Sequence, residues 1–195
     1  MNIAVVGLGF VGLSMSSVFA SKNYNVVGID IDNQKCSDIR NGLLPLFEPN
    51  LENTLRIGLK KKLTISNNFS LIKNCDIIFV TVGTPQKSNG AIELSMIKKA
   101  TTTIGQIIRK SKKNPIIFIK STVIPGTAEN VIVPILERKS GKKANRDFGI
   151  ISNPEFLQES NAIRDTKCPH VIVLGGKQSK YMKKAKMFFS KMHPN

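Results

Sequence analysis

The stretch that decides the fold is Ile3-Ala4-Val5-Val6-Gly7-Leu8-Gly9-Phe10-Val11-Gly12. A short apolar run breaks at a glycine, and a helical pattern follows over residues 10–22, as expected where a buried strand leads into a helix. In this Gly-x-Gly-x-x-Gly motif Gly7 permits a tight turn, Gly9 lets a pyrophosphate approach the backbone, and Gly12 allows close packing of the helix. The positive end of that helix would face the anion.

An acidic residue stands where such a site needs one. Residues 26–29 form the second expected strand, and Asp30 follows it, 18 residues after Gly12 and within reach of the ribose hydroxyls of an adenine dinucleotide. A carboxylate there repels a ribose 2′-phosphate, and no Arg follows it closely, so the sequence favours NAD over NADP. The alternative is that the three glycines serve packing alone.

Short apolar runs alternate with longer amphipathic stretches, the pattern of a parallel sheet with crossover helices. We therefore expect an α/β fold, a Rossmann-type, doubly wound, mostly parallel sheet with helices on both faces, formed by residues 1–195 as one domain. The run over residues 77–82 shows no polar alternation, which predicts a central strand covered on both faces. The expected strands cover residues 3–6, 26–29, 77–82, 116–119, 149–151 and 171–174, and the expected helices residues 10–22, 33–41, 49–59, 95–110 with Ser95 as the cap, 127–138 and 179–192.

The composition is that of an ordinary folded domain except for its charge. The 195 residues are 41% hydrophobic, and three cysteines without Cys-x-x-Cys spacing favour a reducing compartment, so we expect the cytoplasm. A net charge of +16 favours an anionic partner. The basic residues lie in scattered clumps with few aromatic residues between them, which indicates solvated faces and no specific nucleic acid.

Two further signals are interpreted as structural. Residues 3–20 hold no charged residue and have the length of a membrane span or signal peptide, but no basic residue precedes them and glycines and serines dilute them. We expect neither, and no membrane partner. His170 and His193 fall in no ligand pattern, so we assign no metal.

Polar turns follow three of the expected strands. Hydroxyl or carboxylate groups, with Pro or Gly to fix the backbone, occur in Gly83-Thr84-Pro85, in residues 120–127 and in residues 152–160. Because ligands of open α/β sheets bind beyond the carboxyl ends of the strands, we expect these turns to meet around one crevice with the glycine motif. Taken singly, each is also explained by turn chemistry.

Together these motifs resemble the nucleotide-sugar 6-dehydrogenases, the family of UDP-glucose and GDP-mannose dehydrogenases. The resemblance runs from residue 1 to about residue 176. It rests on the glycine motif, Asp30, Glu48-Pro49, Gly83-Thr84-Pro85, Ser121-Thr122-Val123 with Pro125-Gly126-Thr127, and Asn153-Pro154-Glu155-Phe156-Leu157. It implies oxidation of a sugar C6 alcohol to a carboxylate with two NAD, through a thiohemiacetal and a thioester on a cysteine.

The resemblance also implies roles for individual residues. The implied cofactor contacts are Gly7, Gly9, Phe10, Val11, Gly12, Asp30, Lys35, Thr84, Thr122 and Glu159. The implied contacts to a nucleotide-sugar substrate are Glu155, Phe156, Leu157, Gln158 and Glu159. Asp30 and Lys35 would hold the adenosine ribose, and Glu159 would face the nicotinamide side.

Two residues are implied to be catalytic. Glu155 would be the general base that activates water for thioester hydrolysis, with Thr122 close to that water. Without the resemblance, Glu155 is also explained as a helix-capping acid after Pro154.

The family's nucleophilic cysteine has no counterpart in this sequence. It lies in a Gly-x-Cys loop of a second domain, which we expect beyond residue 195, together with a lysine and an asparagine of the preceding long helix. Cys36, Cys75 and Cys168 are interpreted as packing or surface residues. We therefore expect residues 1–195 to be the NAD-binding half of such an enzyme, which binds NAD without turnover, as a monomer alone and a homodimer at full length.

The identity of the sugar nucleotide stays open. Residues 140–144, 147–149, 162–163 and 165 favour GDP-mannose, and UDP-glucose enzymes commonly show Glu-Gly where this chain has Glu159-Ser160. A UDP-glucose enzyme is the alternative. A non-catalytic NAD-sensing module is a second alternative because of the missing cysteine, and a nucleic-acid binder is a third because of the charge.

Overall fold

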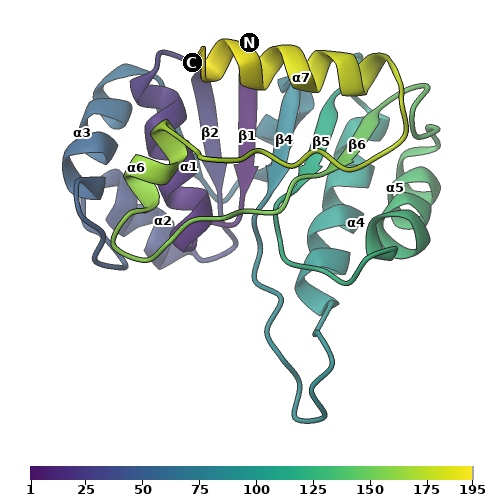
Figure 1. The fold of residues 1–195 in the computed structure, drawn as a ribbon, viewed down its shortest axis with the longest axis horizontal. Coiled ribbons are helices and arrows are strands. Elements are labelled where there is room, and N and C mark those ends of the chain that lie inside the picture. The colour runs from purple at the N-terminus through teal and green to yellow at the C-terminus, as the bar shows by residue number, and fades with distance from the viewer. Residues whose placement is uncertain (195) are drawn as a thin grey trace.

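The computed structural model describes residues 1–194 as one six-stranded parallel sheet flanked by helices (Figure 1). The strands are β1 (Asn2–Val6), β2 (Asn25–Ile29), β3 (Leu63–Ser66), β4 (Ile77–Val80), β5 (Ile116–Ile119) and β6 (Gly149–Ser152). Their order is β3-β2-β1-β4-β5-β6, and every neighbouring pair is parallel. This order is that of doubly wound dinucleotide-binding sheets, so the predicted fold class is confirmed.

Helices cover both faces of the sheet. They are α1 (Phe10–Ser21), α2 (Asn33–Arg40), α3 (Leu51–Lys61), α4 (Ser95–Arg109), α5 (Val133–Ser140), α6 (Ala162–Lys167) and α7 (Lys180–Met192), with a 3-10 turn at Phe69–Asn74 and a π-helical turn at Ala128–Ile132. One apolar core joins α1, α3 and α7, and a second joins α4 and α5. Successive strand residues alternate between the two cores, because neighbouring side chains of a strand point to opposite faces.

The central strands β4 and β5 are buried along their whole length, and their sequences are therefore continuous apolar runs. Phe79 of β4 and Phe118 of β5 stack with ring centroids 4.8 Å apart. Phe188 and Phe189 of α7 pack against these rings. In Figure 1, α7 runs across the end of the sheet at which β1 begins. The opposite, carboxyl edge is therefore not covered by α7.

The predicted strand over residues 171–174 is wrong. This stretch is irregular, and the ladder contact beside it is an isolated bridge between Ser152 and Gly175. Val171 and Val173 are each 41% exposed, whereas Ile172 and Leu174 pack against the core of α1 and α7. The alternation of apolar side chains is real, but it belongs to a loop that is half buried on a helical layer.

Four other elements differ from the sequence pattern. β3, a four-residue strand at the edge of the sheet, and α6, a helix of six residues, have no counterpart among the expected elements. Ser95 is the first residue of α4 and not its cap, and its N–H donates to the Glu93 side chain at 2.7 Å. The helix predicted over residues 127–138 starts as the π-helical turn and continues as α5.

The uncharged stretch over residues 3–20 belongs to the core. It consists of β1, the glycine turn and most of α1, as predicted. Within residues 1–194 no helix has both the length and the apolar character needed to cross a membrane. Cys36 and Cys75 are buried and Cys168 is exposed, as expected for packing and surface residues.

Replacing Phe188 by alanine is expected to destabilise the fold by about 3–5 kcal/mol, because a buried ring is removed and a cavity remains. Phe188 is 5% exposed, and its ring centroid lies within 6.4 Å of those of Phe19, Phe79 and Phe118. The control is Met187→Ala on the same helix, which removes a side chain that is 71% exposed and should change stability by less than about 0.5 kcal/mol. Urea denaturation measures both, and equal effects would contradict the packing of α7.

Candidate functional site

The glycine turn between β1 and α1 requires glycine at two positions for steric reasons. Gly7 has a φ of +99°, which L side chains rarely adopt, and its N–H donates to the carbonyl of Ile29 at 2.8 Å. A Cβ atom at Gly12 would lie 1.8 Å from the carbonyl oxygen of Gly7. Hence α1 starts in direct contact with the turn.

The amino end of α1 presents backbone N–H groups to the outside of this turn. Gly9 precedes the helix, and a Cβ placed on it would meet no atom of the described residues within 4 Å. Phe10 and Val11 begin the first helical turn, which has no acidic residue and, among residues 1–194, no capping side chain. Uncapped N–H groups and the helix dipole together suit an anion, so the turn fits a pyrophosphate.

Asp30 lies at the mouth of the glycine turn. Its Oδ2 accepts a hydrogen bond from the N–H of Leu8 at 2.8 Å and lies 3.1 Å from the ammonium group of Lys35, while Oδ1 accepts from the N–H of Asp32 at 3.1 Å. Burial by itself would raise the pKa of Asp30, but these hydrogen bonds outweigh it and hold the pKa below its ordinary value. The group is an ionised acceptor, suited to ribose hydroxyls.

Thr81, the residue after β4, holds the glycine turn by hydrogen bonds, a role that the sequence motifs do not indicate. Its hydroxyl donates to the carbonyl oxygen of Gly7 at 2.7 Å and lies 3.0 Å from that of Val6. Its backbone N–H also donates to Val6, at 2.8 Å. The sequence feature that could have indicated this role is that Thr81 is the first polar residue after the apolar run of β4.

The loops that follow β4 and β5 are tied together. Thr84 donates its hydroxyl to the Thr122 carbonyl at 2.7 Å, and Ser121 donates to the Val82 carbonyl at 2.7 Å. Because β4 and β5 are parallel neighbours, both loops leave the carboxyl edge of the sheet. The two threonines predicted near the cofactor are therefore in contact, and the Thr122 side chain is exposed.

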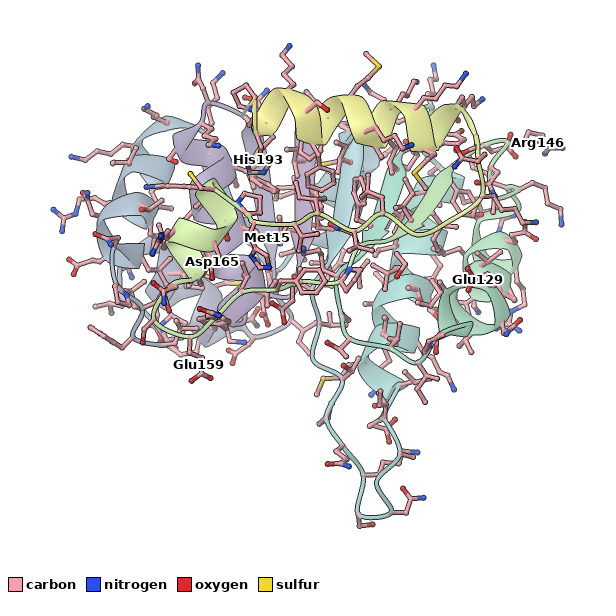
Figure 2. All side chains as sticks on the ribbon, in the orientation of Figure 1. Met15, Glu129, Arg146, Glu159, Asp165 and His193 are labelled. Atoms are coloured by element: carbon pink, nitrogen blue, oxygen red, sulfur yellow. The ribbon has the colours of Figure 1, made fainter. Side chains whose placement is uncertain are left out.

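The segment after β6 carries the predicted substrate contacts. Glu155 folds back on its own chain, where Oε2 accepts a hydrogen bond from the N–H of Leu157 at 2.6 Å. Residues 155–161 are irregular chain and turn, so Glu155 is not a helix-capping acid. Phe156 is 44% exposed. Figure 2 shows Glu159 at the lower left of the molecule, below α6, with its carboxylate directed outward.

Lys120 is a half-buried cation that the sequence motifs do not single out. Its Nζ donates a long, 3.4 Å hydrogen bond to the carbonyl of Pro154. Burial lowers the pKa of Lys120 from 10.5 to about 8, an effect that the charge of Glu155 partly offsets. A cation is thus held directly behind the segment that carries the predicted substrate contacts.

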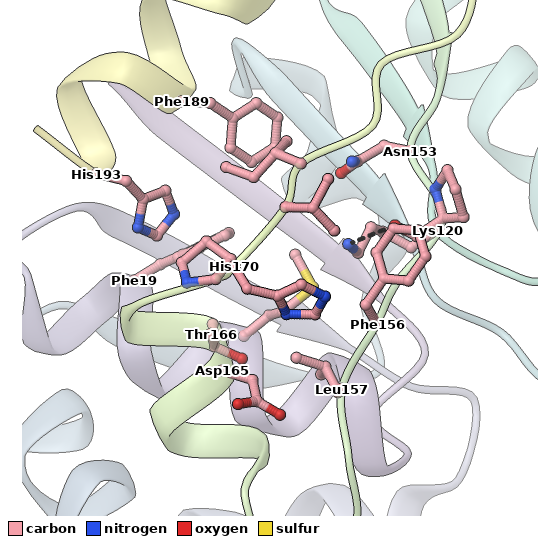
Figure 3. A pocket seen from close by; sticks show the side chains of 15 residues that line it. Phe19, Lys120, Asn153, Phe156, Leu157, Asp165, Thr166, His170, Phe189 and His193 are labelled. Atoms are coloured by element: carbon pink, nitrogen blue, oxygen red, sulfur yellow. Dashed lines mark hydrogen bonds between the residues drawn. The ribbon is translucent and has the colours of Figure 1, made fainter. Parts of the chain in front are cut away.

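Lys120 lines a cavity of about 50 Å³ between α1, α7 and the segment after β6 (Figure 3). Two buried polar atoms in its wall, Asn153 Oδ1 and Thr166 Oγ1, have no hydrogen-bond partner among residues 1–194. The two unpartnered polar atoms and this volume suit ordered water.

The structure gathers the predicted residues into three groups at one edge of the sheet. The glycine turn, Asp30 and Lys35 form the first, Thr84 and Thr122 the second, and residues 155–159 the third. Within the described chain, Glu155 and Thr122, which were predicted to share a water molecule, form no hydrogen bond with each other. Their joint role therefore stays a prediction.

Fold and site together define a dinucleotide-binding domain of the Rossmann type. A family model described as the UDP-glucose/GDP-mannose dehydrogenase family, NAD binding domain, matches residues 1–193, and the chain belongs to this family. The resemblance drawn from the motifs is confirmed, and NAD is the cofactor that defines this family's domain.

Relatives of known name include both branches of the family. The GDP-mannose 6-dehydrogenase of Pseudomonas syringae pv. tomato is 43% identical over 177 residues, which cover 90% of this chain and 40% of the relative. The UDP-glucose 6-dehydrogenase TuaD of Bacillus subtilis is 38% identical over 181 residues, 92% of this chain and 38% of the relative. The chain thus spans about two fifths of the length of these relatives.

A solved structure shows the same fold. The ternary complex of GDP-mannose dehydrogenase from Pseudomonas aeruginosa superimposes with a TM-score of 0.92 at 36% identity, over 98% of this chain and 44% of that one. A UDP-glucose dehydrogenase from Pyrobaculum islandicum gives a TM-score of 0.89 at 30% identity, over 98% of this chain and 43% of that one. The fold alone therefore does not separate the two branches.

Lys120→Met is expected to change how stability depends on pH. Because the pKa of Lys120 falls from 10.5 when unfolded to about 8 when folded, the unfolded chain binds more protons between these two pH values. The free energy of unfolding of the wild type should therefore rise with pH in this window relative to the variant, by roughly 1 kcal/mol per pH unit. Urea unfolding across the window measures the difference, and a difference that does not vary with pH would contradict a buried ammonium group.

Proposed function

We propose that this chain binds NAD with the pyrophosphate against the amino end of α1 and the adenosine ribose on Asp30. The observation that carries the proposal is the Asp30 carboxylate, held 2.8 Å from the N–H of Leu8 at the mouth of the glycine turn. The lowered pKa of Asp30 keeps it charged, which disfavours a 2′-phosphate and hence NADP. Lys35, 3.1 Å from the same carboxylate, would contact the ribose from the first turn of α2.

We further propose that the chain is the cofactor-binding half of a nucleotide-sugar 6-dehydrogenase. Bound NAD would accept hydride from the sugar C6. Glu155 would take a proton from the water that attacks the thioester, and the bond from Leu157 to its Oε2 leaves Oε1 for that proton. Phe156, Leu157, Gln158 and Glu159 would line the substrate. The cytoplasm, the homodimer and the supply of the cysteine by a second domain remain predictions of the same proposal.

GDP-mannose is the substrate that we favour, with UDP-glucose as the alternative. The relatives named GDP-mannose 6-dehydrogenase are 38% to 43% identical to this chain, against 33% and 38% for two relatives named UDP-glucose 6-dehydrogenase. In addition, Ser160 stands where UDP-glucose enzymes commonly have glycine.

Asp30→Ala is expected to weaken NAD binding about 10- to 100-fold, because a charge-assisted hydrogen bond contributes about 1.5–3 kcal/mol. Isothermal titration measures the dissociation constant. The control is Asp76→Ala, since Asp76 also binds a backbone N–H, that of Asn2 at 3.0 Å, and a lysine, Lys113 at 2.7 Å, but at the amino end of β4. Equal losses in the two variants, or an unchanged constant in Asp30→Ala, would remove Asp30 from the site.

The substrate proposal predicts that the full-length gene product reduces NAD with GDP-mannose and forms two NADH per sugar. Absorbance at the NADH band measures this, with UDP-glucose as the comparison. A higher kcat/KM for UDP-glucose would reverse the assignment, and NAD binding without turnover of either sugar nucleotide would favour the non-catalytic sensor.

A further inference from the structure

Glu48 is a buried carboxylate to which neither the resemblance nor the proposed function assigns a role. It lies in the loop between α2 and α3 and is 3% exposed. Its Oε1 accepts a hydrogen bond from the N–H of Ala162 at 2.8 Å, and its Oε2 accepts one from the N–H of Ser160 at 3.0 Å. Within residues 1–194 it forms no ion pair. Each of its carboxylate oxygens is therefore bound to a segment more than a hundred residues away in the chain.

The segment that Glu48 binds contains a strained turn. Ser160 has a φ of +67°, in the left-handed region that glycine adopts readily and other residues rarely do. Such conformations persist where the surrounding structure fixes them, and they cluster at ligand sites. The N–H of Ser160 itself is one of the two groups bound by Glu48, so the contact falls directly on the strained residue.

The same segment is also held by a second carboxylate. Asp165 of α6 accepts the N–H of Gln158 at 3.0 Å, and the Gln158 carbonyl accepts the N–H of Asn161 at 3.0 Å. Glu159, the residue that the resemblance places near the nicotinamide, stands between these anchored positions. Its side chain is exposed.

We propose that Glu48 is a positioning residue that fixes the left-handed turn at Ser160 and thereby directs Glu159 toward the nicotinamide end of the cofactor. This inference rests on the proposed NAD site and on the predicted contact of Glu159 with the nicotinamide side. A carboxylate suits the task because it offers one acceptor oxygen to each N–H. Glutamine in its place would turn an NH₂ group toward one of the two donors and leave that N–H unsatisfied.

The test compares NAD with ADP-ribose, which lacks the nicotinamide ring, by isothermal titration. Glu48→Gln is expected to weaken NAD binding about 10-fold, the equivalent of one lost hydrogen bond, and to leave ADP-ribose binding within about twofold of wild type. The control is Glu137→Gln. Glu137 also accepts a loop N–H, that of Ala144 at 3.0 Å, but it belongs to α5 and should leave both affinities unchanged.

A second variant separates positioning from general loss of structure. Ser160→Gly allows the left-handed turn without help, so the combination of Glu48→Gln with Ser160→Gly should recover NAD affinity to within about threefold of wild type. An equal loss of NAD and ADP-ribose binding in Glu48→Gln, or no recovery in the double variant, would overturn the inference. Unchanged NAD binding in Glu48→Gln would overturn it while leaving the proposed function intact. Absence of NAD binding by the wild type would overturn both.

Discussion

The hydrogen bond from the Leu8 N–H to the Asp30 carboxylate is the contact on which the cofactor site depends. It joins the glycine turn after β1 to the end of β2, its parallel neighbour in the sheet. The second oxygen of Asp30 accepts a hydrogen bond from the N–H of Asp32, and the Asp32 side chain accepts the N–H of Lys35 at 3.0 Å at the start of α2. The ammonium group of Lys35 in turn contacts the Asp30 carboxylate. This closed set of contacts presents a charged acceptor beside the uncapped start of α1.

The parallel sheet brings the glycine turn and the other loops of the site to one edge. All six strands run the same way, so the glycine turn and the loops after β4, β5 and β6 leave at one end, while α7 packs across the other. Hydrogen bonds between these segments fix their relative positions: Thr81 to Gly7, Thr84 to Thr122 and Lys120 to Pro154. Glu48, in the loop between α2 and α3, adds a further bond to Ser160. The frame is apolar and continuous, and the edge is held by polar contacts between residues distant in sequence.

The central strands could be predicted from the sequence because each is determined by residues that are close together in the chain. β1, β2, β4 and β5 are apolar runs bounded by turn residues, and the spacing from Gly12 to Asp30 predicts which edge binds a dinucleotide. Residues 171–174 show the limit, since their alternation is real but the bridge to β6 is confined to Gly175 and Ser152. The roles of Glu48, Thr81 and Lys120 could not be predicted from the sequence. These roles depend on contacts with residues 34 to 114 positions away, which no local sequence pattern records.

The most direct measurement of the central claim is a crystal structure of this chain with NAD. The account predicts the pyrophosphate against the N–H groups at the start of α1 and a ribose hydroxyl within about 3 Å of an Asp30 carboxylate oxygen. A pyrophosphate bound away from the glycine turn, or an adenosine ribose with no contact to Asp30, would contradict it.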